Sequence, residues 1–326
     1  MKKIALFIAV LAIVIKLNAQ IEVTSIATPQ QKPQQVPAFD STRNFLGTLN
    51  VQSYTGQILF VLPKVENKIK WGYEYFKPID YNPKDHFSRY SHYGNDSEKS
   101  KYNTRYEDLT GKYFRVDSIS EKSYTEYLFY LTNTKDETDR CCFIYSALYS
   151  HTFPFIVLSH FNYLKDSFVE KQYIVQSKFH IHPLDIITGD SIKINDDSKI
   201  IWTATDLTII ENNNLLEMRL AFVVKNGNIT TYIDAEEFAK SFENNGRRYI
   251  FETTEWNSLV KKYGLAMMKL VLNEEIKVGM PEKLLFYSWG KPEQVNSSSY
   301  GNKQYVYDNN YVYVKDGKVV SWQTSK

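Results

Sequence analysis

Between residues 45 and 234, short apolar or alternating runs are separated by polar turns. Alternation with a period of two is typical of half-buried β-strands, so we expect a β-rich region here. The clearest part is residues 199–234, where apolar runs are separated by Asn212-Asn213-Asn214 and by Asn226-Gly227. Because Asn-Gly is a strong signal for a β-hairpin, this part predicts an antiparallel meander. The polar stretch 81–106 is expected to be a long loop.

A weak unit recurs in the β-rich region: a Thr-Gly pair followed by an apolar run of period two. It begins at Thr55, Thr110 and Thr188. Each pair predicts a turn ahead of a strand. Two interpretations are open. The units could be repeats of a small antiparallel barrel of the SH3-like kind, which would give two modules, or Thr-Gly could precede a strand by chance.

Helical patterns appear late in the chain. Asp234 can cap a helix over residues 235–242, and Thr254 can cap one over residues 255–263. A glycine follows each of these helices, which suits a left-handed residue at a helix end. We therefore expect residues 235–264 to form a helical connector.

The C-terminal region, residues 265–326, combines helices and strands. Residues 265–272 are expected to form a helix. A second predicted helix begins at Pro281, which suits a first helical position, and stops at Gly290. Three strands follow, and Asp316-Gly317 predicts a tight hairpin turn between the last two. The inward stripe of the second helix is expected to consist of Leu284, Leu285, Ser288 and Trp289.

The predicted hairpin turn sets the register of the last two strands. Val314 would pair with Val319, and Val312 with Ser321. A helix covers only one side of so small a sheet, so we expect the second apolar face to pack against the β-rich region; a surface for a partner or ligand is the alternative. This second face would carry four large side chains, Tyr311, Tyr313, Val320 and Trp322.

Four motifs lie in the same region: Val278-Gly279-Met280, Trp289-Gly290-Lys291-Pro292, Gln304-Tyr305-Val306-Tyr307 and Lys315-Asp316-Gly317-Lys318-Val319. Through them, residues 265–326 resemble the SmpA/OmlA (BamE-like) outer-membrane assembly family. The resemblance implies a two-helix, three-strand α+β domain in the cell envelope. Its structural motif positions would be Gly279, Met280, Gly290, Pro292, Tyr305, Asp316 and Gly317.

The chain departs from the family pattern at three points. Pro281 stands where the family often has Ser or Thr, and Tyr305 stands where Trp is usual. No Cys follows the N-terminal apolar run, so the lipid attachment typical of the family has no acceptor residue there.

The N-terminus has the pattern of a secretory signal. Lys2 and Lys3 precede an unbroken apolar run, and Ala19 offers a cleavage site. The run of about twelve residues is short for a membrane span. We therefore expect residues 1–19 to be a cleaved signal peptide and the mature protein to be periplasmic or secreted, without a lipid anchor or stable membrane insertion. The Gln/Pro-rich residues 20–44 are expected to form an extended linker.

Composition and charge narrow the class of protein. Aromatic residues make up 15% of the 326 residues, which favours strand-rich structure. Together with the late helices, this predicts an α+β fold. Once the three lysines of the signal are removed, the 39 basic and 37 acidic residues come close to balance. A near-neutral chain has no long-range attraction for nucleic acid, so we expect no nucleic-acid partner.

Several side chains could bind a metal ion or act as a nucleophile, but a structural role explains each of them better. His180 and His182 would share one face of a strand, as in half of a zinc site, but no further ligand has motif spacing. Cys141 and a histidine could form a thiol nucleophile, but Cys141-Cys142 lies in a predicted strand, without a helix N-terminus to lower a thiol pKa. Because the side chains of adjacent strand residues point to opposite faces, we expect those of Cys141 and Cys142 to do so.

The remaining candidates also favour a binding protein over an enzyme. Residues 195–198 lack the spaced carboxylates of a calcium loop, and the aromatic stretch 71–76 is interpreted mainly as core. We expect no catalytic residues, no cofactor and no metal. The predicted function is that of a non-enzymatic protein that acts through protein–protein contacts with an envelope partner. The alternative is a carbohydrate- or peptide-binding module that uses exposed aromatics.

Overall fold

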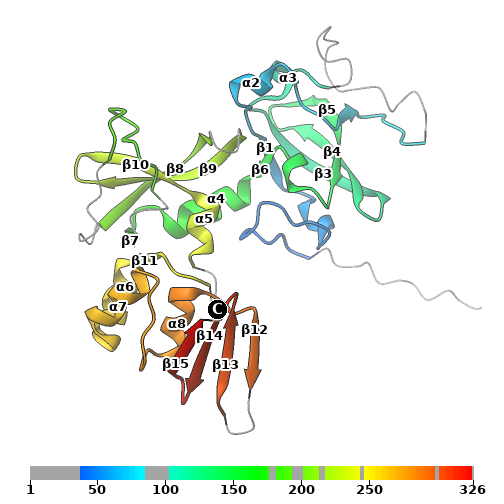
Figure 1. The fold of residues 1–326 in the computed structure, drawn as a ribbon. Helices are drawn as coiled ribbons and strands as arrows, with labels where there is room; N and C mark the ends of the chain where they lie inside the picture. The colour runs from blue at the N-terminus through cyan, green and yellow to red at the C-terminus, as the bar shows by residue number, and fades with distance from the viewer. Residues whose placement is uncertain are drawn as a thin grey trace, which may run out of the picture. The chain divides into compact units, whose positions relative to one another are not determined.

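The computed structural model describes residues 37–84, 103–175, 181–192, 201–212, 217–242, 246–297 and 301–324. These residues form an α+β structure that is rich in strands, with three antiparallel sheets that follow one another in chain order (Figure 1). The predicted fold class is therefore confirmed at this level. The predicted signal peptide and most of the predicted linker and 81–106 loop lie outside the described residues.

The first sheet curls into a half-barrel with the strand order β2-β5-β4-β3-β1-β6. Its strands are β1 (Ile58–Val61), β2 (Phe76–Pro78), β3 (Tyr113–Ser123), β4 (Glu126–Asn133), β5 (Asp136–Ser146) and β6 (Phe155–Val157). The short helical turn η1 (Val51–Tyr54) precedes β1, and α2 (Glu66–Ile69), α3 (Tyr106–Leu109) and η3 (Ser150–Thr152) lie between the strands. Its core is largely aromatic, as the composition suggests, and includes Tyr54, Phe129, Phe143, Tyr145 and Phe155.

One short segment satisfies two of the buried tyrosine hydroxyls of the half-barrel. Tyr54 donates to the carbonyl of Asn44 at 3.0 Å, and Tyr145 donates to the carbonyl of Gly47 at 2.8 Å. The ring of Phe39 lies 5.1 Å from that of Tyr54. A buried hydroxyl needs such partners, since leaving it unpaired costs free energy. The described end of the predicted linker therefore lies against the half-barrel.

The first two Thr-Gly units, at Thr55 and Thr110, lead into β1 and β3, which pair with each other. The N–H of Gly56 donates to β3 at 2.8 Å, and the N–H of Gly111 donates to β1 at 3.2 Å. The two units are therefore neighbours in one sheet rather than separate modules, and the repeat interpretation is wrong for them. The unit at Thr188 leads to an isolated bridge, and residues 193–200 lie outside the described residues.

The second sheet has the strand order β10-β9-β8-β7-β11. Its strands are β7 (Gln172–Val175), β8 (Ile201–Asn212), β9 (Glu217–Asn226), β10 (Ile229–Asp234) and β11 (Ile250–Glu252). The predicted meander is confirmed as β8-β9-β10, and Asn226 pairs with Ile229 across the turn. Two helices, α4 (Leu158–Phe168) and α5 (Ala235–Lys240), contribute Leu164 and Phe238 to the core of this sheet.

Helix α4 lies inside the region for which only strands were expected, so the prediction of late helices is wrong here. Its buried residues His160 and Leu164 are four positions apart and lie on one face. The strand β6 passes directly into the helix at Leu158. A short apolar run that joins a strand to a helix has no clear period of its own, so the sequence pattern did not predict this helix.

The predicted connector, residues 235–264, also contains a strand. Within it, β11 pairs with β7, so the connector supplies one strand of the second sheet. Asp234 caps α5 as predicted: its Oδ1 accepts from the N–H of Glu236 at 2.9 Å and from that of Glu237 at 3.1 Å.

Helix α6 (Thr253–Tyr263) follows β11 directly. It starts before Thr254 and has Glu252 at its N-cap position, so the assignment of Thr254 as the cap is wrong. Gly264, with φ 84°, ends the helix as predicted.

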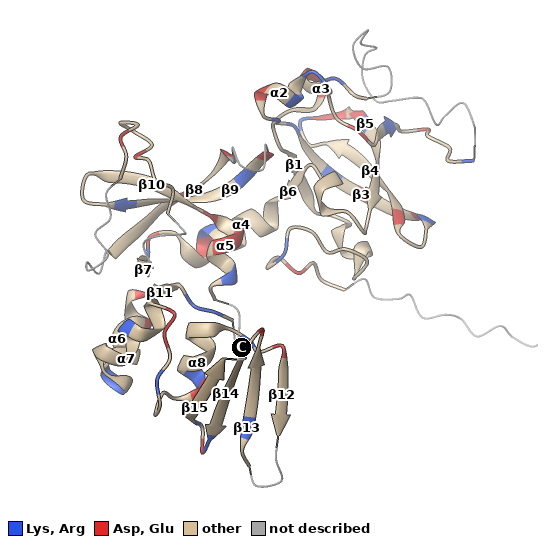
Figure 2. Cartoon of the chain, in the orientation of Figure 1, with Lys and Arg blue, Asp and Glu red and all other residues tan. Residues whose placement is uncertain are grey.

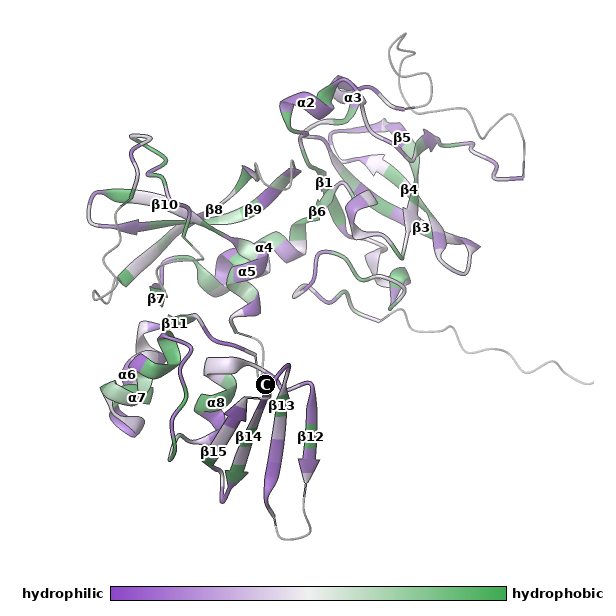
Figure 3. Cartoon of the chain, viewed as in Figure 1, coloured by the Kyte–Doolittle hydropathy of each residue, from purple (hydrophilic) through white to green (hydrophobic). Residues whose placement is uncertain are grey.

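The C-terminal region contains α7 (Leu265–Leu272), α8 (Glu282–Trp289) and a four-stranded sheet of β12 (Gln294–Ser297), β13 (Lys303–Tyr307), β14 (Asn310–Lys315) and β15 (Lys318–Thr324). Both helices were predicted, although Pro281 stands just before α8 instead of at its first position. The expectation of three strands is wrong, because β12 pairs with β13. All four side chains of β12 are exposed and three are hydrophilic, so no apolar pattern marks this strand (Figure 3).

The inner side of this sheet meets α8. Leu284, Leu285 and Ser288 of the predicted stripe are buried, and Trp289 packs against the same core. The sheet contributes the buried side chains Tyr305, Val312, Val314 and Val319 to that core.

Candidate functional site

The predicted interaction face on β14 and β15 is only partly correct. Val314 pairs with Val319 as expected, but Val312 pairs with Trp322 instead of Ser321. The reason is a β-bulge on β15, where Val320 has no partner on β14. One extra residue moves every later side chain to the other face.

Tyr311 and Tyr313 therefore share the outer face of the sheet, whereas Trp322 lies on the side of Val312. Trp322 is 43% exposed, and Val320 at the bulge is 46% exposed. The four residues do not form one apolar face.

The outer face carries polar side chains joined in a hydrogen-bonded row across all four strands. Gln294 donates to Asn296 at 2.8 Å, Asn296 to Gln304 at 2.8 Å, and Gln304 to the hydroxyl of Tyr313 at 2.9 Å. Gln323 donates to the same hydroxyl at 3.0 Å. We call these five residues the amide–tyrosine row. The expectation that both faces of the sheet are apolar is wrong.

The motif positions of the C-terminal region serve the fold. The N–H of Gly279, whose φ is 86°, donates to the carbonyl of Val319 at 2.7 Å, and Met280 is fully buried. Gly290 ends α8 with φ 82°, and Pro292 follows it. Only a residue without a side chain adopts such positive φ values freely.

The other motif positions lie in the sheet. Tyr305 is 2% exposed, and its hydroxyl donates to the carboxylate of Glu282 at the start of α8. Asp316 and Gly317 form the predicted hairpin turn, with φ 48° and 69°. These positions hold helix, strand and turn together.

The two cysteines are buried on opposite faces of β5, as expected for adjacent strand residues. Cys141 belongs to the half-barrel core, and Cys142 packs with Leu128 and Ile144 on the other side. Burial raises the pKa of Cys141, and it raises the pKa of Cys142 to about 12. Both thiols are therefore protonated, and so poor nucleophiles, at neutral pH.

The histidines lie elsewhere. His160 on α4 is 9% exposed, and its Nδ1–H donates to the carbonyl of Ser41 at 2.9 Å. Burial lowers the pKa of His160, which favours the neutral ring. His182 stacks on Tyr232 at 4.2 Å, and His180 and residues 195–198 lie outside the described residues.

The aromatic stretch 71–76 divides between core and surface. Tyr73 and Phe76 are 1% exposed and belong to the half-barrel core. Trp71 is 57% exposed, and the amine of Lys70 lies 5.0 Å from its ring centroid.

A hollow of about 870 Å³ is lined by α4, β9 and α5 together with residues 42–45 and 150–156. We call it the α4–α5 hollow. This volume is within the range of about 300–1,000 Å³ that is usual for ligand sites. Much of its lining is apolar, including Phe45, Phe153, Leu164, Phe168, Leu220 and Phe242.

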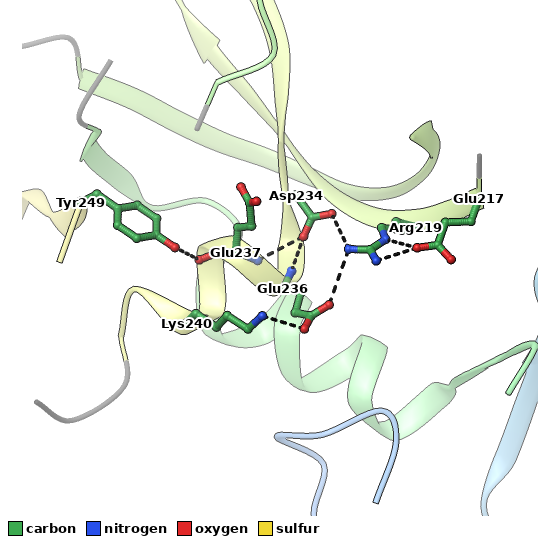
Figure 4. A network of polar contacts seen from close by, with 7 residues as sticks. All are labelled: Glu217, Arg219, Asp234, Glu236, Glu237, Lys240 and Tyr249. Carbon is green, nitrogen blue, oxygen red and sulfur yellow. Dashed lines mark hydrogen bonds and ion pairs between the residues drawn. The ribbon is translucent and has the colours of Figure 1, made fainter. Parts of the chain in front are cut away.

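Charged side chains line the other part of the hollow and form the network in Figure 4. Arg219 on β9 contacts Glu217 at 2.6 Å, and it lies 3.7 Å from both Asp234 and Glu236. Lys240 contacts Glu236 at 2.9 Å. Acidic and basic residues thus lie side by side on α5 (Figure 2).

The network keeps charges of both signs at the hollow. The hydrogen bond from Lys240, aided by its charge and that of Arg219, holds the pKa of Glu236 below its ordinary value despite burial. Asp234 is occupied in part by capping α5, since its Oδ1 accepts two backbone N–H groups. The arrangement can hold a molecule that has apolar groups and charges of both signs.

Sequence reasoning did not predict this site. Glu217 and Arg219 are alternate residues of β9 and so share one face, which the sequence shows. Their approach to Asp234 and Glu236 depends on the pairing of β9 with β10, in which Ala221 lies opposite Asp234. No local pattern marks that approach.

Among the described residues, no group of three or more His, Cys, Asp or Glu is placed to hold a metal ion, and no helix has the length and apolar character to cross a membrane. Comparison of the chain with protein-family models, with curated proteins and with solved structures finds no match.

Proposed function

We propose that this chain is a non-enzymatic binding protein of the cell envelope that acts through contacts with other proteins. We assign the α4–α5 hollow as the place where a peptide segment of a partner binds. The observation that carries the proposal is the lining of the hollow, which is apolar in one part and carries charges of both signs in the other.

A peptide segment suits this lining for physical reasons. An apolar peptide side chain would bury surface against Phe168, Leu220 and Phe242, which stabilises binding by about 25 cal/mol for each Å² removed from water. Charged peptide side chains would find both Arg219 and Glu217 on β9. Such charges contribute more to orientation and specificity than to affinity.

The location in the envelope rests on the N-terminal pattern of Lys2, Lys3, an apolar run and Ala19. Two further predictions accompany this location: the resemblance of residues 265–326 to the SmpA/OmlA family, and the SH3-like character of the half-barrel. N-terminal sequencing of the exported protein tests the location. A chain that starts at or near Gln20 in a soluble envelope fraction is expected; Met1 retained in a membrane fraction would contradict it.

Selection from a random peptide library, followed by calorimetric titration of the selected peptides, tests the binding itself. Met218→Asp places a carboxylate in the hollow at a half-buried side chain, and Ile187→Asp makes the same change at a side chain that is 71% exposed elsewhere. We expect selected peptides to lose at least tenfold in affinity with Met218→Asp and none with Ile187→Asp. Peptides that bind both variants equally would contradict the assignment.

A charge reversal keeps the test decisive if Met218→Asp is unstable. Lys240→Glu reverses a charge whose side chain is 56% exposed at the hollow, and Lys225→Glu is the matched change at the exposed end of β9. Acidic selected peptides should weaken with the first variant only.

A further inference from the structure

The amide–tyrosine row presents both hydrogen-bond donors and acceptors. Each primary amide has two N–H donors and uses one of them within the row. The hydroxyl oxygen of Tyr313 accepts two amide N–H groups, from Gln304 and Gln323, and its own hydrogen is not used within the row. The oxygens of Asn296 and Gln304 accept within the row, whereas those of Gln294 and Gln323 do not. A ligand that carries hydroxyl groups, which both donate and accept, therefore matches this face.

The donors lie in a regular array because they belong to neighbouring strands. Asn296, Gln304, Tyr313 and Ser321 are directly paired from β12 to β15. Neighbouring strands are about 4.8 Å apart, so donors recur at that spacing across the sheet. Tyr311 and Tyr313 add half-buried ring surface to the same face.

A second hollow of about 550 Å³ lies beside the row. The described residues that line it include Lys303 and Lys315 and no Asp or Glu. Lys303 pairs with the inward-facing Val314, and its amine contacts Glu282 of α8 at 2.9 Å, so Lys315 is the source of positive charge on the outer face. Polar lining residues include Asn296, Ser297, Asn302, Gln304 and Ser321.

We propose that the outer face of the C-terminal sheet binds an acidic polysaccharide, in which the amide–tyrosine row donates to sugar oxygens and Lys315 contacts a sugar carboxylate. Three properties of the face favour this ligand: amide and hydroxyl groups that match sugar hydroxyls, the positive charge of Lys315 at the hollow, and tyrosine rings for the apolar faces of sugars. The proposal does not depend on the α4–α5 hollow, since the two sites share no lining residue.

Gln304→Glu is the sharpest variant. It keeps the size of the side chain, still accepts from Asn296, and can accept from Tyr313 if that hydroxyl reverses. It removes two donors and places a negative charge beside the hollow. Gln172→Glu, at an exposed position of β7 in the second sheet, is the matched control.

The experiment is a titration of the fluorescently labelled chain with polygalacturonate, with dextran as the neutral polysaccharide and double-stranded DNA as an unrelated polyanion. We expect polygalacturonate to bind and dextran and DNA to bind at least tenfold more weakly. Gln304→Glu and Lys315→Glu should each weaken polygalacturonate binding at least tenfold. Gln172→Glu should not, nor should Lys277→Glu, the control for Lys315 at an exposed residue between α7 and α8.

Near-ultraviolet circular dichroism of each variant shows whether the fold is kept. If a variant of the row does not fold, the binding of the unchanged chain to polygalacturonate, compared with dextran and DNA, still tests the proposal. No binding to polygalacturonate, equal binding to dextran, equal binding to DNA, or equal loss in the controls would each overturn the proposal.

Discussion

Arg248 contacts the carboxylate of Glu255 at 2.6 Å while its guanidinium lies among three aromatic rings. The ring centroids of Phe242, Phe251 and Tyr287 are 4.9, 5.0 and 5.1 Å from the guanidinium carbon. Arg248 is 7% exposed, and its backbone N–H donates to the carbonyl of Tyr287 on α8 at 2.8 Å. One buried cation thus joins the segment before β11 to helices α6 and α8.

Arg248→Met is expected to destabilise the chain by about 2–3 kcal/mol, because it removes the partner of Glu255 and the contacts with three rings. The loss is less than for a fully buried pair, since the Glu255 side chain is 34% exposed. Arg248→Lys keeps the charge but loses the planar stacking, so its free energy of unfolding should lie between those of the parent and Arg248→Met. Urea denaturation measures the stability of all three proteins. A Met variant as stable as the parent would show that the contacts of Arg248 with Glu255 and the three rings contribute nothing.

Two glycines with positive φ make a matched pair in the half-barrel. A Cβ on Gly72 would lie 2.1 Å from the carbonyl oxygen of Thr104, whereas a Cβ on Gly111 would meet nothing within 4 Å. Gly111→Ala should therefore cost only the conformational penalty, about 1–2 kcal/mol. Gly72→Ala should cost at least about 2 kcal/mol more, because backbone must move. Equal thermal midpoints for the two variants would disprove the close approach.

Two variants separate the contribution of Asp234 to stability as a helix cap from its contribution as a charge. Asp234→Ala removes the acceptor for the N–H groups of Glu236 and Glu237 and should cost about 1 kcal/mol. Asp234→Asn keeps an acceptor of the same shape and should cost less than half as much. Guanidinium denaturation of both variants checks this order, and an equal loss in the two variants would assign the stability to the ion pair with Arg219 instead.

Stability should fall as the pH rises above about 9. Burial raises the pKa values of Tyr54, Tyr145 and both cysteines, and that of Cys142 to about 12. Cysteines of the unfolded chain lose their protons near pH 8.5–9 and tyrosines near pH 10, so above these values the folded chain binds more protons. The free energy of unfolding then decreases with pH until the folded-state groups also ionise.

Urea denaturation at pH 7, 9 and 10.5 measures this slope. Replacement of both cysteines by Ala should keep the fold, cost about 1–3 kcal/mol at pH 7, and flatten the slope that begins near pH 9. Stability that stays constant up to pH 10.5 would show that these groups are not buried.

Local signals predicted much of the fold. Asp234, Gly264, Gly290 and Asp316-Gly317 each set a helix cap or a turn within a few residues, and the structure has all of them. Two of the failures are non-local. The bulge at Val320 reverses the side of Trp322, and the pairing of β1 with β3 places the first two Thr-Gly units in one sheet.

The candidate sites were less accessible to sequence reasoning for the same reason. The α4–α5 hollow needs α4, β9 and α5 together, and the sequence pattern did not predict α4. The amide–tyrosine row depends on β12, whose exposed side chains carry no apolar pattern, and on the register after the bulge. Tyr311 and Tyr313 were correctly placed on one face, but the polar residues beside them were not.

Photo-crosslinking in the cells that make this chain shows whether a partner peptide occupies the α4–α5 hollow. A benzophenone amino acid replaces Met218, which lines the hollow, and in a second strain it replaces the exposed Ile187. We expect a discrete crosslinked protein from position 218 that is absent from position 187 and, for an acidic partner segment, is lost when Lys240→Glu is added. No product at position 218, or the same products from both positions, would show that no partner peptide binds there.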